Sequence, residues 1–206
     1  MFQKFMSFAL AASAALVMSG CVSPSNSSAS SEAAPEQTPS MERARDGSFT
    51  ESEVVGAVED WLGVSAETAG RIVKQVFADL GTPNAYVYGE EASAAIGPGL
   101  RYGRGTLLMN DNSTQAVYWQ GPSIGWDLGA NASKTFTLVY NLPTPDTIYQ
   151  RFPGVEGTAY LVGGVGVNYQ RAEGVTLVPM RAGVGARLGA NVGYLAYSRD
   201  ARLWPF

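Results

Sequence analysis

The period of the apolar residues changes near Ala85, and this change constrains the fold more than any other feature of the sequence. Residues 50–80 place apolar side chains three and four positions apart, the spacing of an amphipathic helix. After Ala85, short runs rich in Val, Tyr, Phe, Leu and Thr alternate with polar residues, as in half-buried strands. The chain is therefore expected to be mainly β, with its helices confined to the start of the folded region.

Two helices are expected ahead of the strands. Thr50–Glu53 reads as a capping box, so the first helix should continue to about Leu62. Ser65 should cap a second helix that ends at Leu80, because Gly81 follows it. Each helix carries one apolar stripe, which should pack against the structure that follows.

Eight runs are expected to be strands: Ala85–Tyr88, Gly99–Met109, Gln115–Gln120, Thr135–Leu142, Thr158–Tyr169, Val175–Arg181, Val184–Leu188 and Val192–Tyr197. Between them lie segments expected to form turns, namely Asn110–Ser113, Gly129–Lys134 and Arg171–Gly174, and a short helical turn over Pro145–Phe152. Short antiparallel strands and 24 glycines predict a curled sheet that closes and so removes its exposed edges. The expected fold is a small antiparallel β-barrel with two N-terminal α-helices packed on it.

The first 46 residues are expected to lie outside this fold. Residues 1–20 combine one lysine, an apolar run and two small residues, the layout of a signal peptide. Residues 21–46 are rich in Ser, Ala, Pro and Glu, which indicates a disordered tether. The folded domain is therefore expected to span 47–206.

Cys21 is the only cysteine and follows the small pair Ser19-Gly20, as in bacterial lipoprotein signals. We expect it to be acylated and to anchor the chain to the outer membrane, because Val22 stands where inner-membrane retention usually has Asp. Two or three acyl chains anchor a domain stably. The alternative is an ordinary cleaved signal, with Cys21 removed or left as a free thiol.

Composition excludes several classes of enzyme. The sequence contains no histidine, which removes a Ser-His-Asp triad, a Cys-His pair and an ordinary zinc site. The glycine motifs Gly163–Gly166 and Gly183–Gly185 do not open a helix after a strand, so they are interpreted as strand bends and no cofactor is expected. Residues 92–206 carry nine basic and six acidic side chains, a surplus too dilute for nucleic-acid binding.

Aromatic residues concentrate in the β region. Core packing accounts for most of them, but a small barrel with surplus aromatic volume is also able to line an apolar pocket. The candidates for such a pocket are Tyr118, Trp119, Trp126, Phe136, Tyr140 and Tyr160.

Several long segments resemble the alphaproteobacterial family of envelope integrity protein A (EipA-like), a domain family of unknown function. They are Tyr86–Glu91, Gly99–Thr106, Tyr118–Gly125, Leu138–Pro143, Thr147–Gly154, Ala159–Gly166 and Arg181–Leu195. The resemblance covers roughly residues 48–206. It implies a periplasmic domain with a small antiparallel barrel, short helices and a hydrophobic pocket, a role in keeping the cell envelope intact, and no known enzymatic activity.

The leading hypothesis is a non-catalytic protein of the periplasm and cell envelope whose barrel binds a hydrophobic ligand, a lipid or an envelope partner. One alternative is an integral outer-membrane barrel, suggested by the terminal Phe206 but opposed by Pro205, which cannot donate within a closing strand. The other is a carboxylate-dependent cell-wall hydrolase, although the sequence specifies no pair of facing carboxyls.

Overall fold

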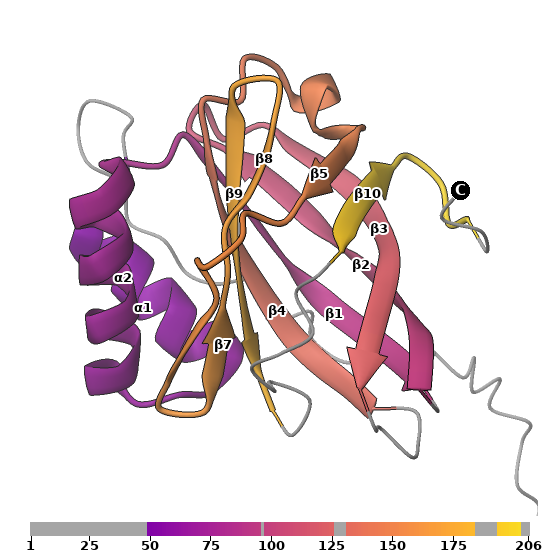
Figure 1. Ribbon diagram of the computed structural model, residues 1–206. Coiled ribbons are helices and arrows are strands. Elements are labelled where there is room, and N and C mark those ends of the chain that lie inside the picture. Colours follow the sequence, from indigo (N-terminus) through magenta and orange to yellow (C-terminus); the bar gives the residue numbers. More distant parts are fainter. Residues whose placement is uncertain (1–48, 96, 126–130, 184–192, 203–206) are drawn as a thin grey trace, which may run out of the picture. The chain divides into compact units, whose positions relative to one another are not determined.

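The structure, a computed structural model, describes residues 49–95, 97–125, 131–183 and 193–202 (Figure 1). The expected signal peptide, Cys21, the tether and the expected strand Val184–Leu188 lie outside these residues. Within the described residues, no helix combines the length and apolar character needed to cross a bilayer.

Both expected helices are present with the expected ends, α1 over Glu51–Leu62 and α2 over Ala66–Leu80. Thr50 completes the capping box, because its hydroxyl accepts from the Glu53 amide and the Glu53 carboxylate accepts from the Thr50 amide at 2.6 Å. The Ser65 hydroxyl accepts from the Thr68 amide at 3.2 Å and so caps α2.

Ten described strands form one antiparallel sheet: β1 (Ala85–Ala95), β2 (Gly97–Met109), β3 (Thr114–Gly125), β4 (Asn131–Tyr140), β5 (Arg151–Pro153), β6 (Tyr160–Val162), β7 (Val165–Val167), β8 (Gln170–Ala172), β9 (Val175–Ala182) and β10 (Tyr194–Ser198). The strand order is β5-β10-β3-β2-β1-β4-β9-β7-β6, and β8 pairs separately with β9. A 3-10 helix at Pro145–Ile148 precedes β5.

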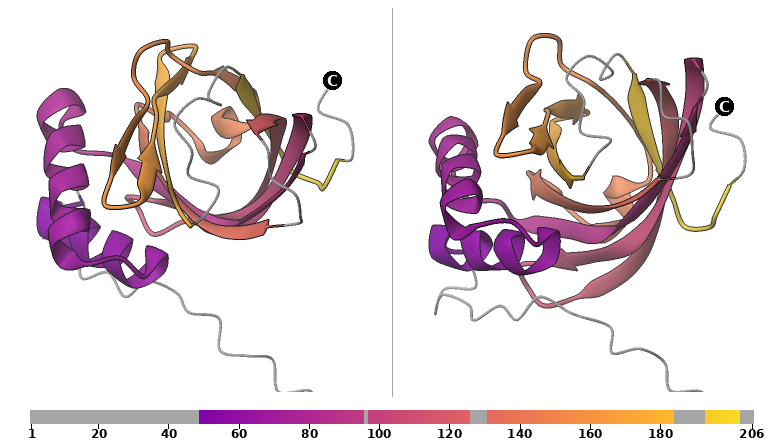
Figure 2. Two further views of the ribbon diagram at one scale, coloured as in Figure 1. Left: turned by 60° about the horizontal axis from the view of Figure 1, so that its bottom comes forward. Right: turned by 90° about the horizontal axis from the view of Figure 1, so that it is seen from below.

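The sheet curls strongly, so that its two ends approach each other (Figure 2). An isolated bridge between Gly154, after β5, and Gln170, in β8, joins them. The backbone amide of Val155 also donates to the carbonyl of Tyr169 at 2.8 Å. The expected barrel-like antiparallel sheet with two helices is therefore confirmed.

Two glycines that face each other across β1 and β2 permit the sharp curl. Gly89 pairs with Gly105, and a Cβ on either residue would lie 2.2 Å from a carbonyl oxygen of the opposite strand. Real side chains do not approach backbone so closely. The close approach of β1 and β2 at this pair therefore requires glycine at both positions.

The two faces of the sheet contribute to two separate cores. Alternate residues of β1 point to opposite faces, so Tyr86 packs under the helices while Val87 faces the interior of the curl. On the outer face, Trp61 of α1 donates its indole N–H to the Thr135 carbonyl at 3.0 Å and ties the helix to β4. Figure 1 shows both helices on one side of the sheet, next to β4 and β7.

Several expected boundaries were wrong. β1 continues past Tyr88 to Ala95, because its second half pairs with β2 and β4 along its length. The run Thr158–Tyr169 is divided into β6 and β7 by Gly163-Gly164, whose positive φ angles of 55° and 84° form a turn rather than a strand bend.

Two expected turns and the helical turn are also shorter than expected. Asn131–Lys134 belongs to β4, and Arg171-Ala172 belongs to β8, which leaves Glu173-Gly174 as the tip of that hairpin. The helical turn ends at Ile148, because the residues that follow enter β5, where Phe152 is buried.

The interior of the curl also contains a buried cluster of charges around Glu91 of β1. Arg181 Nε donates to Glu91 Oε1 at 3.0 Å, and Arg101 Nη1 lies 3.7 Å from the same oxygen. The indole N–H of Trp119 donates to Glu91 Oε2 at 2.9 Å. The ring of Trp119 lies against Gly103, where any Cβ would be 2.0 Å from it, and this packing fixes the direction of the indole N–H.

The net effect of this environment is to keep Glu91 ionised. Burial raises the pKa of the Glu91 carboxyl, but the charges of Arg181 and Arg101 and the hydrogen bonds from Trp119 and Arg181 outweigh it and lower the pKa below 4.5. The carboxylate therefore stabilises the folded state at pH values above about 4.5, and this contribution is lost as the pH falls through the folded-state pKa.

The glycine constraint predicts the effect of one methyl group. Gly105→Ala should lower the free energy of unfolding by about 1–3 kcal/mol, because the new Cβ meets backbone that cannot move aside. Gly70→Ala, in α2 with nothing within 4 Å, is the control and should raise it by about 0.5–1 kcal/mol. Urea unfolding measures both, and equal stability of the two variants would contradict the constraint.

The Glu91 cluster predicts a pH-dependent stability. Glu91→Gln should lower the free energy of unfolding at pH 7 by about 3–5 kcal/mol, because two buried guanidinium groups lose their counter-charge. The difference from wild type should shrink below about pH 4.5, where the wild-type carboxyl is also neutralised. The exposed neighbour Glu90 supplies the control Glu90→Gln, and a difference that persists unchanged at low pH would refute the assignment.

Candidate functional site

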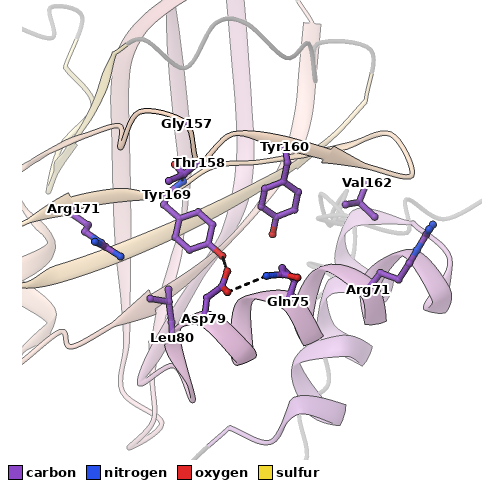
Figure 3. Close-up of a pocket in the computed structure, with 10 residues that line it drawn as sticks. All are labelled: Arg71, Gln75, Asp79, Leu80, Gly157, Thr158, Tyr160, Val162, Tyr169 and Arg171. Carbon is purple, nitrogen blue, oxygen red and sulfur yellow. Dashed lines mark hydrogen bonds between the residues drawn. The ribbon is translucent and has the colours of Figure 1, made fainter.

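A cavity of about 620 Å³ lies between α2 and the segment that contains β6 (Figure 3). Its lining combines two tyrosines and two aliphatic side chains with five polar or charged ones and a glycine: Arg71, Gln75, Asp79, Leu80, Gly157, Thr158, Tyr160, Val162, Tyr169 and Arg171. The cavity therefore lies outside the curled sheet, beside the helices, and not in its interior.

One face of α2 forms the polar wall of the cavity. Arg71, Gln75 and Asp79 follow each other at intervals of four residues and so share one face of the helix. Gln75 Nε2 donates to Asp79 Oδ1 at 3.0 Å. The buried stripe of α2, which includes Ile72 and Val76, packs in the outer core and keeps this polar face turned away from that core.

The opposite wall comes from β6 and the residues near β8. Tyr160 and Val162 line the cavity, whereas Leu161 between them points away and is 45% exposed. Tyr169 donates its hydroxyl to Asp79 Oδ2 at 2.7 Å and so joins the two walls. Figure 3 shows both tyrosine rings pointing towards α2.

The phenol groups near Asp79 stay neutral at physiological pH. Burial raises the pKa of Tyr169, and its hydrogen bond to the Asp79 carboxylate raises the pKa further. Burial likewise raises the pKa of Tyr160 and of Tyr140, with the charge of Asp79 adding to both shifts. The hydroxyl oxygens of Tyr160 and Tyr140 are buried, and neither makes a hydrogen bond of standard geometry with a described residue. A contact with the Tyr169 hydroxyl nevertheless offsets part of the pKa rise at Tyr160. Only Tyr160 of these two lines the cavity.

The structure distributes the aromatic pocket candidates over different environments. Of the six, Tyr160 lines the cavity. Phe136 and Tyr140 lie in the outer core under the helices, and Trp119 lies in the inner core. Tyr118 belongs to neither core and is half-buried, and Trp126 lies outside the described residues.

The sequence analysis did not single out the helical half of the cavity. A signal for it existed, because Arg71, Gln75 and Asp79 form a polar stripe beside the apolar stripe of α2. The partner of that stripe depends on the hairpin of β6 and β7, which sequence reasoning had joined into one strand. No group of three or more metal-ligating side chains occurs in the part of the chain that the structure describes.

Comparison with known proteins connects this fold to a family. A solved structure from Brucella abortus, described as a beta-barrel-like, uncharacterized protein, is 42% identical with a TM-score of 0.71. The match covers 78% of this chain and 99% of that one. No curated protein matches the chain. Residues 47–206 match the family described as Envelope integrity protein A. This confirms the expected resemblance, and the chain belongs to the envelope integrity protein A (EipA) family.

Proposed function

We propose that this member of the family is a non-catalytic envelope protein that binds an amphipathic lipid in the cavity between α2 and β6. The observation that carries the proposal is the lining of that cavity, in which aliphatic and aromatic surface lies beside the buried hydroxyl of Tyr160, for which the described residues supply no hydrogen bond of standard geometry.

The dimensions and lining of the cavity suit a lipid chain. Its volume of about 620 Å³ lies within the range of roughly 300–1,000 Å³ that is typical of small-molecule pockets. Leu80, Val162 and the tyrosine rings offer apolar surface, and burial of each methylene contributes about 0.8 kcal/mol. Arg71 and Arg171 are exposed and border the cavity on opposite sides of the view in Figure 3, where they suit an anionic headgroup.

The buried hydroxyl of Tyr160 favours a ligand that carries a polar group as well as an apolar chain. A buried donor without a partner costs about 1–3 kcal/mol, and an ester carbonyl or hydroxyl of a ligand would remove this cost at Tyr160. Tyr169 donates its hydroxyl to Asp79, and its contact with Tyr160 offsets only part of the pKa rise that burial causes at Tyr160. A purely aliphatic ligand would leave Tyr160 unsatisfied, so the proposal specifies an amphipathic one.

The carboxylates of the cavity and of the Glu91 cluster already have hydrogen-bond or ion-pair partners within the protein. This supports a binding role without catalysis. Asp79 accepts hydrogen bonds from Gln75 and Tyr169, and Glu91 is paired with two arginines. The pKa of the Glu91 carboxyl is lowered by the neighbouring arginines, which is the opposite of what a general acid needs at neutral pH. The sequence supplies no histidine to take that role.

The proposed location is the periplasmic face of the outer membrane. It is supported by the signal-like residues 1–20, by Cys21 directly after them and by the polar segment 21–46, which would act as a tether. Even an incompletely extended tether of this length lets the domain reach lipids or an envelope partner near the anchor.

Ligand binding is tested by two substitutions in one strand. Val162→Asp should weaken saturable binding of a fluorescent fatty acid at least tenfold, because it places an unpaired carboxylate in the apolar part of the cavity. Leu161→Asp, on the exposed face of β6, should leave the affinity unchanged. Unfolding midpoints establish that both variants fold. Equal affinities, or no saturable binding by wild type, would rule out this cavity as the site.

Membrane anchoring is tested separately at Cys21. Cys21→Ser should move the protein from the membrane pellet to the soluble periplasmic fraction, because a serine hydroxyl does not accept the thioether-linked lipid. Fractionation with immunoblotting, together with the intact mass of the mature chain, measures the change. A mature wild-type mass without acyl chains would contradict the anchor and leave the cavity proposal intact.

A further inference from the structure

Arg101 of β2 is a largely buried arginine that has no carboxylate of its own among the described residues. Its side chain is 12% exposed, and its nearest ion-pair contact is the 3.7 Å separation from Glu91 Oε1. The guanidinium makes no hydrogen bond with any described residue, and its Nε is fully buried without a partner. Burial of an arginine that loses its hydrating water without gaining hydrogen bonds lowers the stability of the folded state. A bound ligand that supplies the missing hydrogen bonds would explain why this arginine is present.

Arg181 already satisfies Glu91. Its Nε and Nη2 donate to the two carboxylate oxygens of Glu91 at 3.0 and 3.5 Å, and its Nη1 donates to Asn168 Oδ1 at 3.1 Å. Trp119 supplies a further hydrogen bond to the same carboxylate. Among the described residues, one carboxylate therefore faces two guanidinium groups, which leaves this cluster with one surplus positive charge.

We infer that Arg101 binds a singly charged oxyanion, a carboxylate or a phosphodiester group, inside the curled sheet. The planar guanidinium offers two parallel N–H donors that match the paired oxygens of such a group. One negative charge would balance the surplus, whereas a dianion would reverse it and face repulsion from Glu91.

Neighbouring groups at the same level of the interior support this assignment. Asn168 holds Arg181 through its carbonyl oxygen, and its amide nitrogen is buried with no partner. The side chain of Arg101 keeps 12% of its surface exposed, although its Nε is fully buried. This site is separate from the cavity beside α2, so it does not depend on the proposed function.

Calorimetric titration of the full chain at constant ionic strength tests the inference. The free-anion probes are acetate and, at pH 6, inorganic phosphate, and the lipid probe is a short-chain phosphatidylglycerol below its micelle concentration. Wild type should bind with one-to-one stoichiometry. If all probes bind, the anionic group alone is sufficient for binding. If only the lipid binds, the ligand is the headgroup of a lipid and not a free anion. Absence of saturable binding by every probe overturns the inference.

Matched variants assign the binding to this residue. Arg101→Gln should lose at least tenfold in affinity, and Arg101→Lys should be weakened because it keeps the charge but not the two parallel donors. Arg104→Gln removes the same charge from the exposed face of β2 and should bind as wild type does. Equal affinity of the Arg101→Gln variant and wild type would overturn the assignment.

Thermal unfolding separates a binding role from a structural one. In buffer without small anions, Arg101→Gln should unfold at the same temperature as wild type or higher, because it leaves the neutral pair of Glu91 and Arg181. Addition of the anion should raise the midpoint of wild type alone. A lower midpoint for the variant in the anion-free buffer would show that Arg101 is a structural residue and would refute the inference.

Discussion

Strand β1 separates two interiors, and its alternating side chains contribute to both. Tyr86 and Tyr88 pack under the helices, whereas Val87 and Glu91 face the inside of the curl. This alternation follows from the pleat of the strand, and at Gly89 the backbones of β1 and β2 come too close for any side chain. Strand β1 therefore links three features of the fold. These are the curl of the sheet, the packing of the helices on its outer face and the position of the Glu91 carboxylate inside the curl.

The same arrangement separates the cavity beside α2 from the interior of the curl. Side chains such as Leu107, Phe152 and Tyr197 form the inner core, and the Glu91 cluster lies in the same interior. The helices cover the outer face of β4 and β9, but α2 meets β6 along a polar stripe that does not pack tightly. An amphipathic molecule is therefore expected at the edge of the helical layer, where apolar surface and the buried Tyr160 hydroxyl lie together.

Local chemistry made some elements predictable and left others hidden. The caps at Thr50 and Ser65 involve residues three positions apart, so the ends of the helices could be predicted from residues that are close in the sequence. Strand pairing, in contrast, joins residues that are far apart in the sequence. The second half of β1 has little apolar character and is a strand because β2 and β4 pair with it, so the sequence predicted it too short. Adjacent residues Tyr118 and Trp119 looked equivalent, and only the register assigns Trp119 to the inner core.

The central claim is that the cavity beside α2 holds an amphipathic lipid, and native mass spectrometry of the protein isolated from its own envelope tests it most directly. The account predicts a mass equal to the mature chain plus one amphiphile, released on denaturation and identified as a molecule with one polar end. A bare mature chain under conditions that preserve known protein–lipid complexes would contradict it.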